Sequence, residues 1–255
     1  YLLHPQRQRS GRIYEDLRDL AGRDQDRILR QRRIYMLREI DLAEVSDGKL
    51  YTARDMVKAG CDDCRGCCDC CKDMGKSVVL DPYDVFRLEE GLGQSFQELL
   101  TYALELNVVD GIILPNLKMT GEEERCSFLS PEGRCSIHPY RPGFCRMFPL
   151  GRIYEEGGFH YFLQVHECPK QPKTKVKVSK WLDTPELKKY ETYVLAWHSF
   201  LKKAEKILAQ FQNPEEAKNV SMYILKNFFL ASWDFTEDFY GQFEEKLKAG
   251  EKYFF

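Results

Sequence analysis

Six of the ten cysteines in this chain lie within eleven residues, and this crowding constrains the fold more than any other feature. The six are Cys61, Cys64, Cys67, Cys68, Cys70 and Cys71. Disulfides between such close positions would remove little entropy from the unfolded chain, so secreted disulfide scaffolds space their cysteines more widely. Dense thiolates are better explained as metal ligands, because a cation offsets their repulsion and lowers their pKa. The sequence therefore predicts a metal-binding protein of a reducing compartment, the cytoplasm.

The spacing of the cysteines favours an iron–sulfur cluster over zinc. Structural zinc commonly uses two Cys-x2-Cys pairs, and the downstream cysteines form no second pair; these four are Cys126, Cys135, Cys145 and Cys168. The first three cysteines of the run have the Cys-x2-Cys-x2-Cys spacing that also opens bacterial ferredoxin motifs. We expect one or two clusters of the 4Fe–4S type, with zinc as the alternative.

The chain divides into three predicted regions. Residues 1–59 form a basic helical arm, since residues 1–40 hold ten arginines against six acids. The arm is either simply solvated or docks onto an acidic partner or RNA, and a short helix capped by Thr52 ends it at Gly60. Residues 60–175 form the cysteine-cluster domain, and residues 176–255 form a C-terminal helical region.

The cysteine-cluster domain combines a few helices with short strands. A strand at 77–80 precedes a helix with Asp81 as its N-cap, and Ser95 caps another after a turn at 91–93. Residues 111–166 read as a small antiparallel sheet with hairpin turns at 130–133 and 155–158. We expect the four downstream cysteines on this sheet or at its ends.

Three amphipathic helices are predicted in the C-terminal region. The first follows a Thr184 cap and runs from Leu187 to Phe211, the second begins at 213–216, and the third is marked by Phe239 and Phe243. The aromatic residues from 228 to 243 are interpreted as core, with a binding groove as the alternative. The fold class is therefore α+β: a loop-rich metal-binding cysteine knot with a small antiparallel sheet, flanked by an N-terminal helical arm and a C-terminal helical bundle.

Composition excludes several other classes of protein. With 43% hydrophobic and 31% charged residues in 255, the chain is neither disordered nor fibrous. A net charge of −2 gives no attraction to nucleic acid, so we expect no nucleic-acid partner. The sequence contains no apolar run long enough to predict a membrane segment, and its first ten residues lack the pattern of a secretion signal.

The combined motifs resemble a known family. Cys61-Asp-Asp-Cys64-Arg-Gly-Cys67-Cys68, then Cys126-Ser-Phe-Leu, Gly133-Arg-Cys135-Ser-Ile-His138, Arg141-Pro142, Cys145-Arg146 and Cys168-Pro169 are similar to the CxxCxxCC family, often called YkgJ-like and described as zinc- or iron-chelating. The resemblance covers roughly residues 60–170. Flagellin lysine-N-methylases share this domain, and for them it implies an iron–sulfur centre and S-adenosylmethionine as the methyl donor.

The resemblance implies a set of site residues. The ligand set is Cys61, Cys64, Cys67, Cys68, Cys126, Cys135, Cys145 and Cys168. Cys70 and Cys71 depart from the family core, and their role as ligands, as an extra centre or as spare thiols stays open. Arg141 and Arg146 either balance the charge of a cluster or bind the carboxylate of S-adenosylmethionine or of a substrate. His138 and His166 are candidates for ligation or for hydrogen bonds to thiolates.

Two functions are compatible with these features. One is an enzyme that methylates a protein or peptide side chain, although no Gly-rich Rossmann motif is present for the donor. The other is a non-catalytic electron-transfer protein or a metal-stabilised docking module. The number of protein ligands on each metal discriminates them, because an open coordination position favours catalysis.

Overall fold

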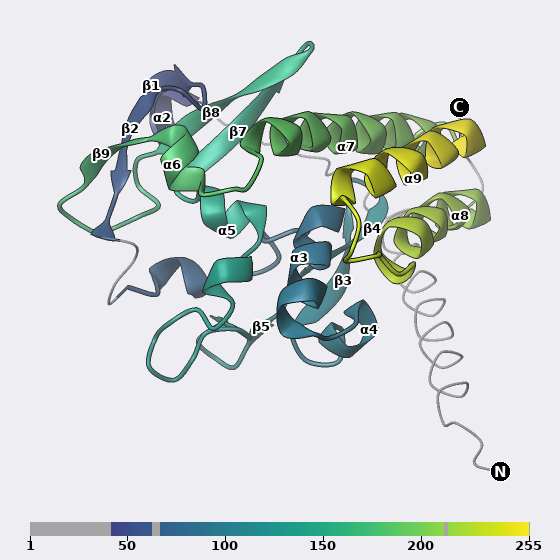
Figure 1. The fold of residues 1–255 in the computed structure, drawn as a ribbon, viewed down its shortest axis with the longest axis horizontal. Helices are drawn as coiled ribbons and strands as arrows, with labels where there is room; N and C mark the ends of the chain where they lie inside the picture. The colour runs from purple at the N-terminus through teal and green to yellow at the C-terminus, as the bar shows by residue number, and fades with distance from the viewer. Residues whose placement is uncertain (1–41, 63–66, 212–213, 255) are drawn as a thin grey trace.

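The computed structural model describes residues 42–62, 67–211 and 214–254. The strands at residues 46–60, 150–164 and 174–177 lie at one end of the molecule, and three long helices lie at the other, next to the strands at residues 104–117 (Figure 1). The mixed helix-and-strand class and the small antiparallel sheets confirm the coarse prediction. The predicted arm at 1–40 and Cys64 lie outside the described residues, and the metal-binding knot stays a prediction.

The described strands form four small antiparallel sheets. One is three-stranded: β1 (Ser46–Tyr51), β8 (Gly158–Gln164) and β7 (Leu150–Glu155). Three are two-stranded: β2 (Met56–Gly60) with β9 (Thr174–Lys177), β3 (Leu104–Val109) with β4 (Ile112–Leu117), and β5 (Met119–Thr120) with β6 (Arg125–Cys126). Both predicted hairpin turns are present, at 130–133 and 155–158. The strand expected at 77–80 is reduced to one bridge, between Val79 and Asn116.

The described helices differ greatly in length. They are α2 (Leu42–Val45), α3 (Pro82–Leu92), α4 (Phe96–Leu99), α5 (Gly143–Met147), α6 (Val178–Leu182), α7 (Leu187–Leu208), α8 (Pro214–Leu225) and α9 (Phe239–Phe254). Short 3₁₀ turns η2 (Asp69–Cys71) and η3 (His138–Tyr140) and a π-helical segment η4 (Lys226–Leu230) complete the set. The predicted caps at Asp81 and Ser95 are confirmed, and each forms a capping box.

The short helix predicted to end at Gly60 is wrong, because the segment is strand β2. Val57 and Ala59 are buried while their neighbours are exposed or half-buried, which is the two-residue period of a strand. The segment is a strand because it pairs with β9, which lies more than a hundred residues away in the sequence. The residues around Gly60 alone give no sign of this pairing. Thr52 instead closes a turn, in which the amide of Asp55 donates to its carbonyl over 3.1 Å.

Three further predictions need correction. α7 begins after Glu186 and not after Thr184, whose hydroxyl donates to the carbonyl of Leu182. Gly91 belongs to helix α3 and not to the following turn; a Cβ there would overlap the ring of Tyr140, so the position accepts only glycine. Cys145 lies on helix α5 and not on the sheet.

Aromatic packing joins the C-terminal helices to α3. The ring of Tyr193 on α7 lies 4.5 Å from that of Phe243 on α9, and Tyr83 on α3 lies 5.0 Å from Phe239, measured between centroids. Most aromatic residues from 228 to 243 are therefore core, as interpreted, whereas Phe235 is exposed. Buried residues on both sides of residue 175 share this core, while the division of the chain at residues 60 and 175 stays a prediction. A second core lies between the β1–β8–β7 sheet and α6. No described helix has the length and apolar character to cross a membrane.

Glu89 on α3 gives the fold a pH dependence. Its Oε1 accepts a hydrogen bond from the amide of Phe96 over 2.7 Å, and burial raises the pKa of Glu89 from 4.5 to about 7. Because the folded state binds the proton more tightly, stability is full below pH 4.5 and falls as the pH rises through 7.

We predict that Glu89→Gln removes this loss, since the amide oxygen still accepts from Phe96 but carries no charge. With a discount for the exposed part of the side chain, the variant should be more stable than the wild type by about 1–2 kcal/mol at pH 8. Urea unfolding at pH 5 and pH 8 measures this. An equal stability of the two proteins at both pH values would contradict it.

Candidate metal centre

The structure brings the crowded cysteines and the four downstream ones together in two neighbouring cavities. The first thiol cavity has a volume of about 50 Å³ and is lined by Cys67, Cys70, Cys71, Cys126, Cys135 and Cys145. The second thiol cavity has a volume of about 20 Å³ and is lined by Cys61, Cys67, Cys70 and Cys168. No disulfide joins any two of the described cysteines. Cysteines more than sixty residues apart in sequence are therefore neighbours in space.

A backbone bridge places Cys71 beside Cys126. Lys72 and Arg125 form an isolated antiparallel bridge, and the amide of Asp73 donates to the carbonyl of Glu124 over 3.1 Å. Cys71 directly precedes Lys72 and Cys126 directly follows Arg125, so the bridge brings both cysteines to the first thiol cavity, which both of them line. The end of the cysteine run is thus held against strand β6.

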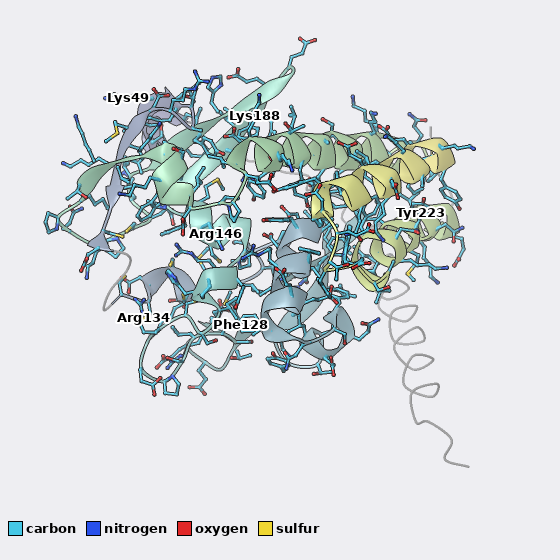
Figure 2. The ribbon with its side chains drawn as sticks, viewed as in Figure 1. Lys49, Phe128, Arg134, Arg146, Lys188 and Tyr223 are labelled. Atoms are coloured by element: carbon cyan, nitrogen blue, oxygen red, sulfur yellow. The ribbon has the colours of Figure 1, made fainter. Side chains whose placement is uncertain are left out.

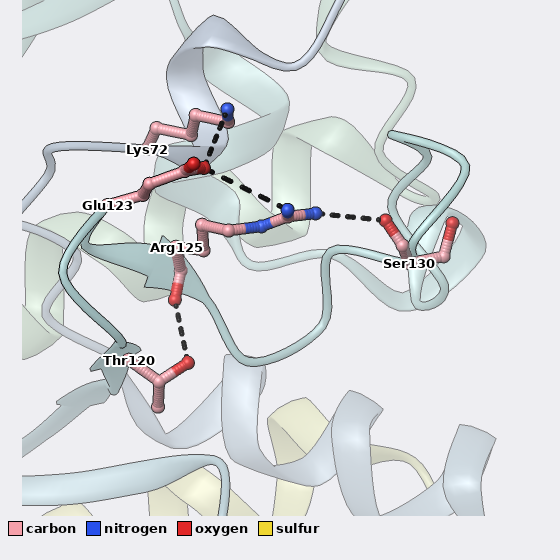
Figure 3. Close-up of polar contacts among 5 residues, drawn as sticks. All are labelled: Lys72, Thr120, Glu123, Arg125 and Ser130. Carbon is pink, nitrogen blue, oxygen red and sulfur yellow. Dashed lines mark hydrogen bonds and ion pairs between the residues drawn. The ribbon is translucent and has the colours of Figure 1, made fainter.

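Polar side chains reinforce this bridge (Figure 3). Glu123 lies between two cations, with its Oε2 at 3.3 Å from Lys72 Nζ and at 3.9 Å from Arg125 Nη1. Arg125 Nη2 also donates to the carbonyl of Ser130 over 3.3 Å, and the hydroxyl of Thr120 donates to the carbonyl of Arg125. These contacts connect the cysteine run, the β5–β6 hairpin and the 130–133 turn.

The 130–133 turn returns the chain so that Cys135 faces the same cavity. Leu129 and Cys135 form an isolated antiparallel bridge, and the amide of Ser136 donates to the carbonyl of Phe128 over 2.9 Å. Gly133 has a φ of 75°, a left-handed conformation that glycine adopts without strain. The turn predicted at 130–133 therefore helps to place the thiol of Cys135 at the first thiol cavity.

Helix α5 carries Cys145 into the first thiol cavity, and Asp84 positions this helix. The buried Oδ1 of Asp84 accepts a hydrogen bond from the amide of Gly143, the first residue of α5, over 2.7 Å. The same carboxylate completes the capping box of α3, where its Oδ2 accepts from the amide of Asp81. One side chain thus links the start of α3 to the start of α5.

The β2–β9 pair brings together the two cysteines at the second thiol cavity. Cys61 directly follows β2, and Cys168 precedes β9, whose Thr174 pairs with Gly60. Lys173 Nζ donates to the carbonyl of Cys168 over 2.7 Å, which holds the intervening loop. On the opposite wall, Cys67 Sγ lies 3.2 Å from Asp69 Oδ2.

Burial and mutual repulsion keep most of these thiols protonated. Burial raises the pKa of Cys145 well above the ordinary value, and the negative charges of neighbouring thiolates raise it further. Burial has the same effect on Cys126 and Cys135. Cys70 is the exception, because a hydrogen bond from Cys71 lowers its pKa to about 7 while that of Cys71 rises. A bound cation would reverse these shifts, since a coordinating thiol gives up its proton.

The donor set of the first thiol cavity fits a thiophilic metal. Besides the thiols, it is lined by apolar side chains such as Val78, Leu117 and Ile137, and among the described residues no carboxylate lines it. Soft sulfur ligands select zinc or iron–sulfur clusters over magnesium or calcium. Across the three described ranges, however, no three His, Cys, Asp or Glu side chains already surround one point at ligand distance. The chemistry fits, and the thiols would draw together when metal binds.

The remaining residues of the expected site have different surroundings. Cys64 lies outside the described residues, and Cys68 lines neither cavity. His138 lines the first thiol cavity, whereas His166 is exposed. Their roles as ligands stay predictions.

The two arginines differ in how far their donors are occupied. Arg146 donates from Nε to the carbonyl of Arg141 over 3.1 Å, from Nη1 to that of Asp183 over 2.8 Å, and from Nη2 to that of Pro139. Its guanidinium therefore joins α5 to the segments before and after it. Arg141 lines the first thiol cavity, and its buried Nε has no hydrogen-bond partner among the described residues. Arg134 also lines this cavity, away from the C-terminal helices (Figure 2).

Two residues of the site were not singled out from the sequence. Met119 lines the first thiol cavity and pairs with Cys126 across the β5–β6 hairpin. Asp84 stands three residues after the Asp81 cap, at the place where a capping box puts its second acidic residue. The spacing signalled its role in α3, but nothing local signalled its bond to Gly143.

We predict that Asp84→Ala destabilises the protein by about 2–4 kcal/mol, because it leaves two buried backbone amides without acceptors. Asp84→Asn is the matched control, since its amide oxygen still accepts from Gly143, and it should lose less than half as much. Denaturant unfolding measures both. An Asp84→Ala variant as stable as the wild type would show that this carboxylate does not position α5.

Comparison with protein families agrees with the cysteine pattern. Residues 63–177 match the model of the CxxCxxCC family, whose description is "Putative zinc- or iron-chelating domain". No curated protein and no solved structure matches the chain. The matched segment contains the described cysteines from Cys67 to Cys168, which include all six that line the first thiol cavity. Residues 63–177 of this chain are therefore similar to the CxxCxxCC family, in agreement with the motifs that the sequence contains.

Proposed function

We propose that this protein is an iron–sulfur protein of the cytoplasm in which cysteine thiolates hold the metal. The observation that carries the proposal is the first thiol cavity, where six cysteines from three chain segments face one enclosed volume. Similarity to a zinc- or iron-chelating family supports the metal itself. The free thiols support a reducing compartment, because closely spaced cysteines in an oxidising one would form disulfides.

The surroundings of the cavity favour an iron–sulfur cluster over a single zinc ion. Arg134 and Arg141 line the same cavity, and their charges would balance the negative charge of a cluster held by thiolates. When bound, such a cluster would supply one-electron transfer at a potential that these cations and the apolar walls adjust.

The number of thiols favours an electron-transfer or structural role. The described residues provide enough thiols to satisfy a metal without leaving a position open to substrate.

Metal and sulfide analysis of the anaerobically purified protein tests the proposal. We predict iron together with acid-labile sulfide in comparable amounts and a broad thiolate-to-iron absorption in the visible range. Zinc without labile sulfide would contradict the cluster and leave a zinc-chelating module. The absence of both metals would contradict metal binding itself.

A second candidate is transfer of a methyl group from S-adenosylmethionine to a lysine of a protein or peptide substrate. It is favoured by Arg141, whose buried Nε lies unpartnered beside the thiols and could receive a carboxylate. Arg87 and Arg146 line a further small cavity with Arg141, so positive charge is concentrated there.

Calorimetry with S-adenosylmethionine discriminates this candidate. If the protein binds this donor, Arg141→Gln should weaken binding at least tenfold, because a charge-assisted hydrogen bond is lost. The matched control is Arg54→Gln, whose side chain is exposed and lines none of the three cavities. No heat of binding with the wild type would remove the methylase candidate.

A further inference from the structure

We propose that the chain holds two separate metal centres with four thiolates each, and that the crowded cysteine run supplies ligands to both. The first centre comprises Cys71, Cys126, Cys135 and Cys145. The second comprises Cys61, Cys67, Cys70 and Cys168. This inference rests on the proposed metal-binding function and assigns roles to Cys70 and Cys71, the two cysteines that the family pattern does not contain.

The walls of the two cavities separate the cysteines into groups. Four of them line only the first thiol cavity, namely Cys71, Cys126, Cys135 and Cys145. Two line only the second, Cys61 and Cys168, and two lie between the cavities and line both, Cys67 and Cys70. The first cavity thus has a complete set of four without the shared pair. Assigning the shared pair to the second cavity completes four there as well.

The chain around η2 is compatible with different roles for Cys70 and Cys71. Cys71 directly precedes Lys72, whose bridge partner Arg125 directly precedes Cys126, and Cys71 lines only the first thiol cavity, so we assign it to the first centre. Cys67 and Cys70 are three residues apart around the turn η2, which is the Cys-x2-Cys spacing of metal-binding knuckles. Both also line the second thiol cavity, so Cys70 would give up the hydrogen bond that it accepts from Cys71 when it binds metal there.

The cysteines exclusive to each centre are held by different elements. Cys61 and Cys168 are held by the β2–β9 pair and by Lys173, whereas the first centre depends on the β5–β6 hairpin and on α5. Loss of a ligand from one centre should consequently leave the elements of the other in place. Four thiolates on each centre also give closed ligand sets, which suits structural or electron-transfer centres.

Metal content of single variants tests the division. Cys126→Ser removes a ligand exclusive to the first centre, and Cys168→Ser removes one exclusive to the second. Each should lose about half of the iron and zinc bound per chain, and the double variant should lose nearly all, because separated sites act additively. Thr101→Ser is the control: its side chain is exposed and lines neither cavity, and serine keeps the hydroxyl that donates to the carbonyl of Glu98, so its metal content should equal that of the wild type.

Loss of all metal from either single variant, while its circular dichroism stays native, would show one shared centre and overturn the proposal. If a variant fails to fold, native mass spectrometry of the wild-type holoprotein provides the test instead. There we expect two metal centres that are lost one after the other, and a single centre would contradict the inference. If the wild type holds no metal, the proposed function fails; if it holds one centre, only this inference fails.

Discussion

The burial of many thiols at one place is the physical constraint on which the structure depends. A buried thiolate is unfavourable, and several together repel one another, so the cavity is stable either with protonated thiols or with a cation among them. The raised pKa of Cys145 and its neighbours shows the first condition. The opposite pKa shifts of Cys70 and Cys71 show how strongly adjacent thiols influence each other. A metal would convert this unfavourable arrangement into a source of stability, because its binding energy is also folding energy.

The rest of the fold holds these thiols in position through a short chain of contacts. Rings from α7 and α9 pack against Tyr83 on α3, and the hydroxyl of Tyr193 accepts a hydrogen bond from the amide of Tyr83 over 3.0 Å. From α3, Asp84 reaches the start of α5 and so fixes the helix that bears Cys145. The C-terminal helices thus have a clear part in the site, although none of the described thiols lies on them.

Local signals in the sequence predicted much of this structure. The caps at Asp81 and Ser95, the two hairpin turns and the aromatic core depend on neighbours in sequence, and all are confirmed. β2 was predicted wrongly because its partner β9 lies far along the chain, and a five-residue segment has too little periodicity to reveal its type. The position of Cys145 on a helix was missed because α5 is only five residues long and is held by a distant carboxylate.

The site shows the same division between local and distant information. The density and spacing of the cysteines predicted a metal-binding protein, and the family match agrees with that. Which thiols share a cavity depends on single bridges such as that between Lys72 and Arg125, which join segments more than fifty residues apart. No spacing rule contains this information, so the sequence left Cys70 and Cys71 without a role.

X-ray absorption at the metal edge of the purified protein tests the central claim most directly, because it reports the atoms bound to the metal whatever the function proves to be. The account predicts a first shell made of sulfur alone, with about four sulfur atoms at about 2.3 Å from each metal. A first shell dominated by nitrogen or oxygen would contradict it, since the metal would then lie away from the two thiol cavities.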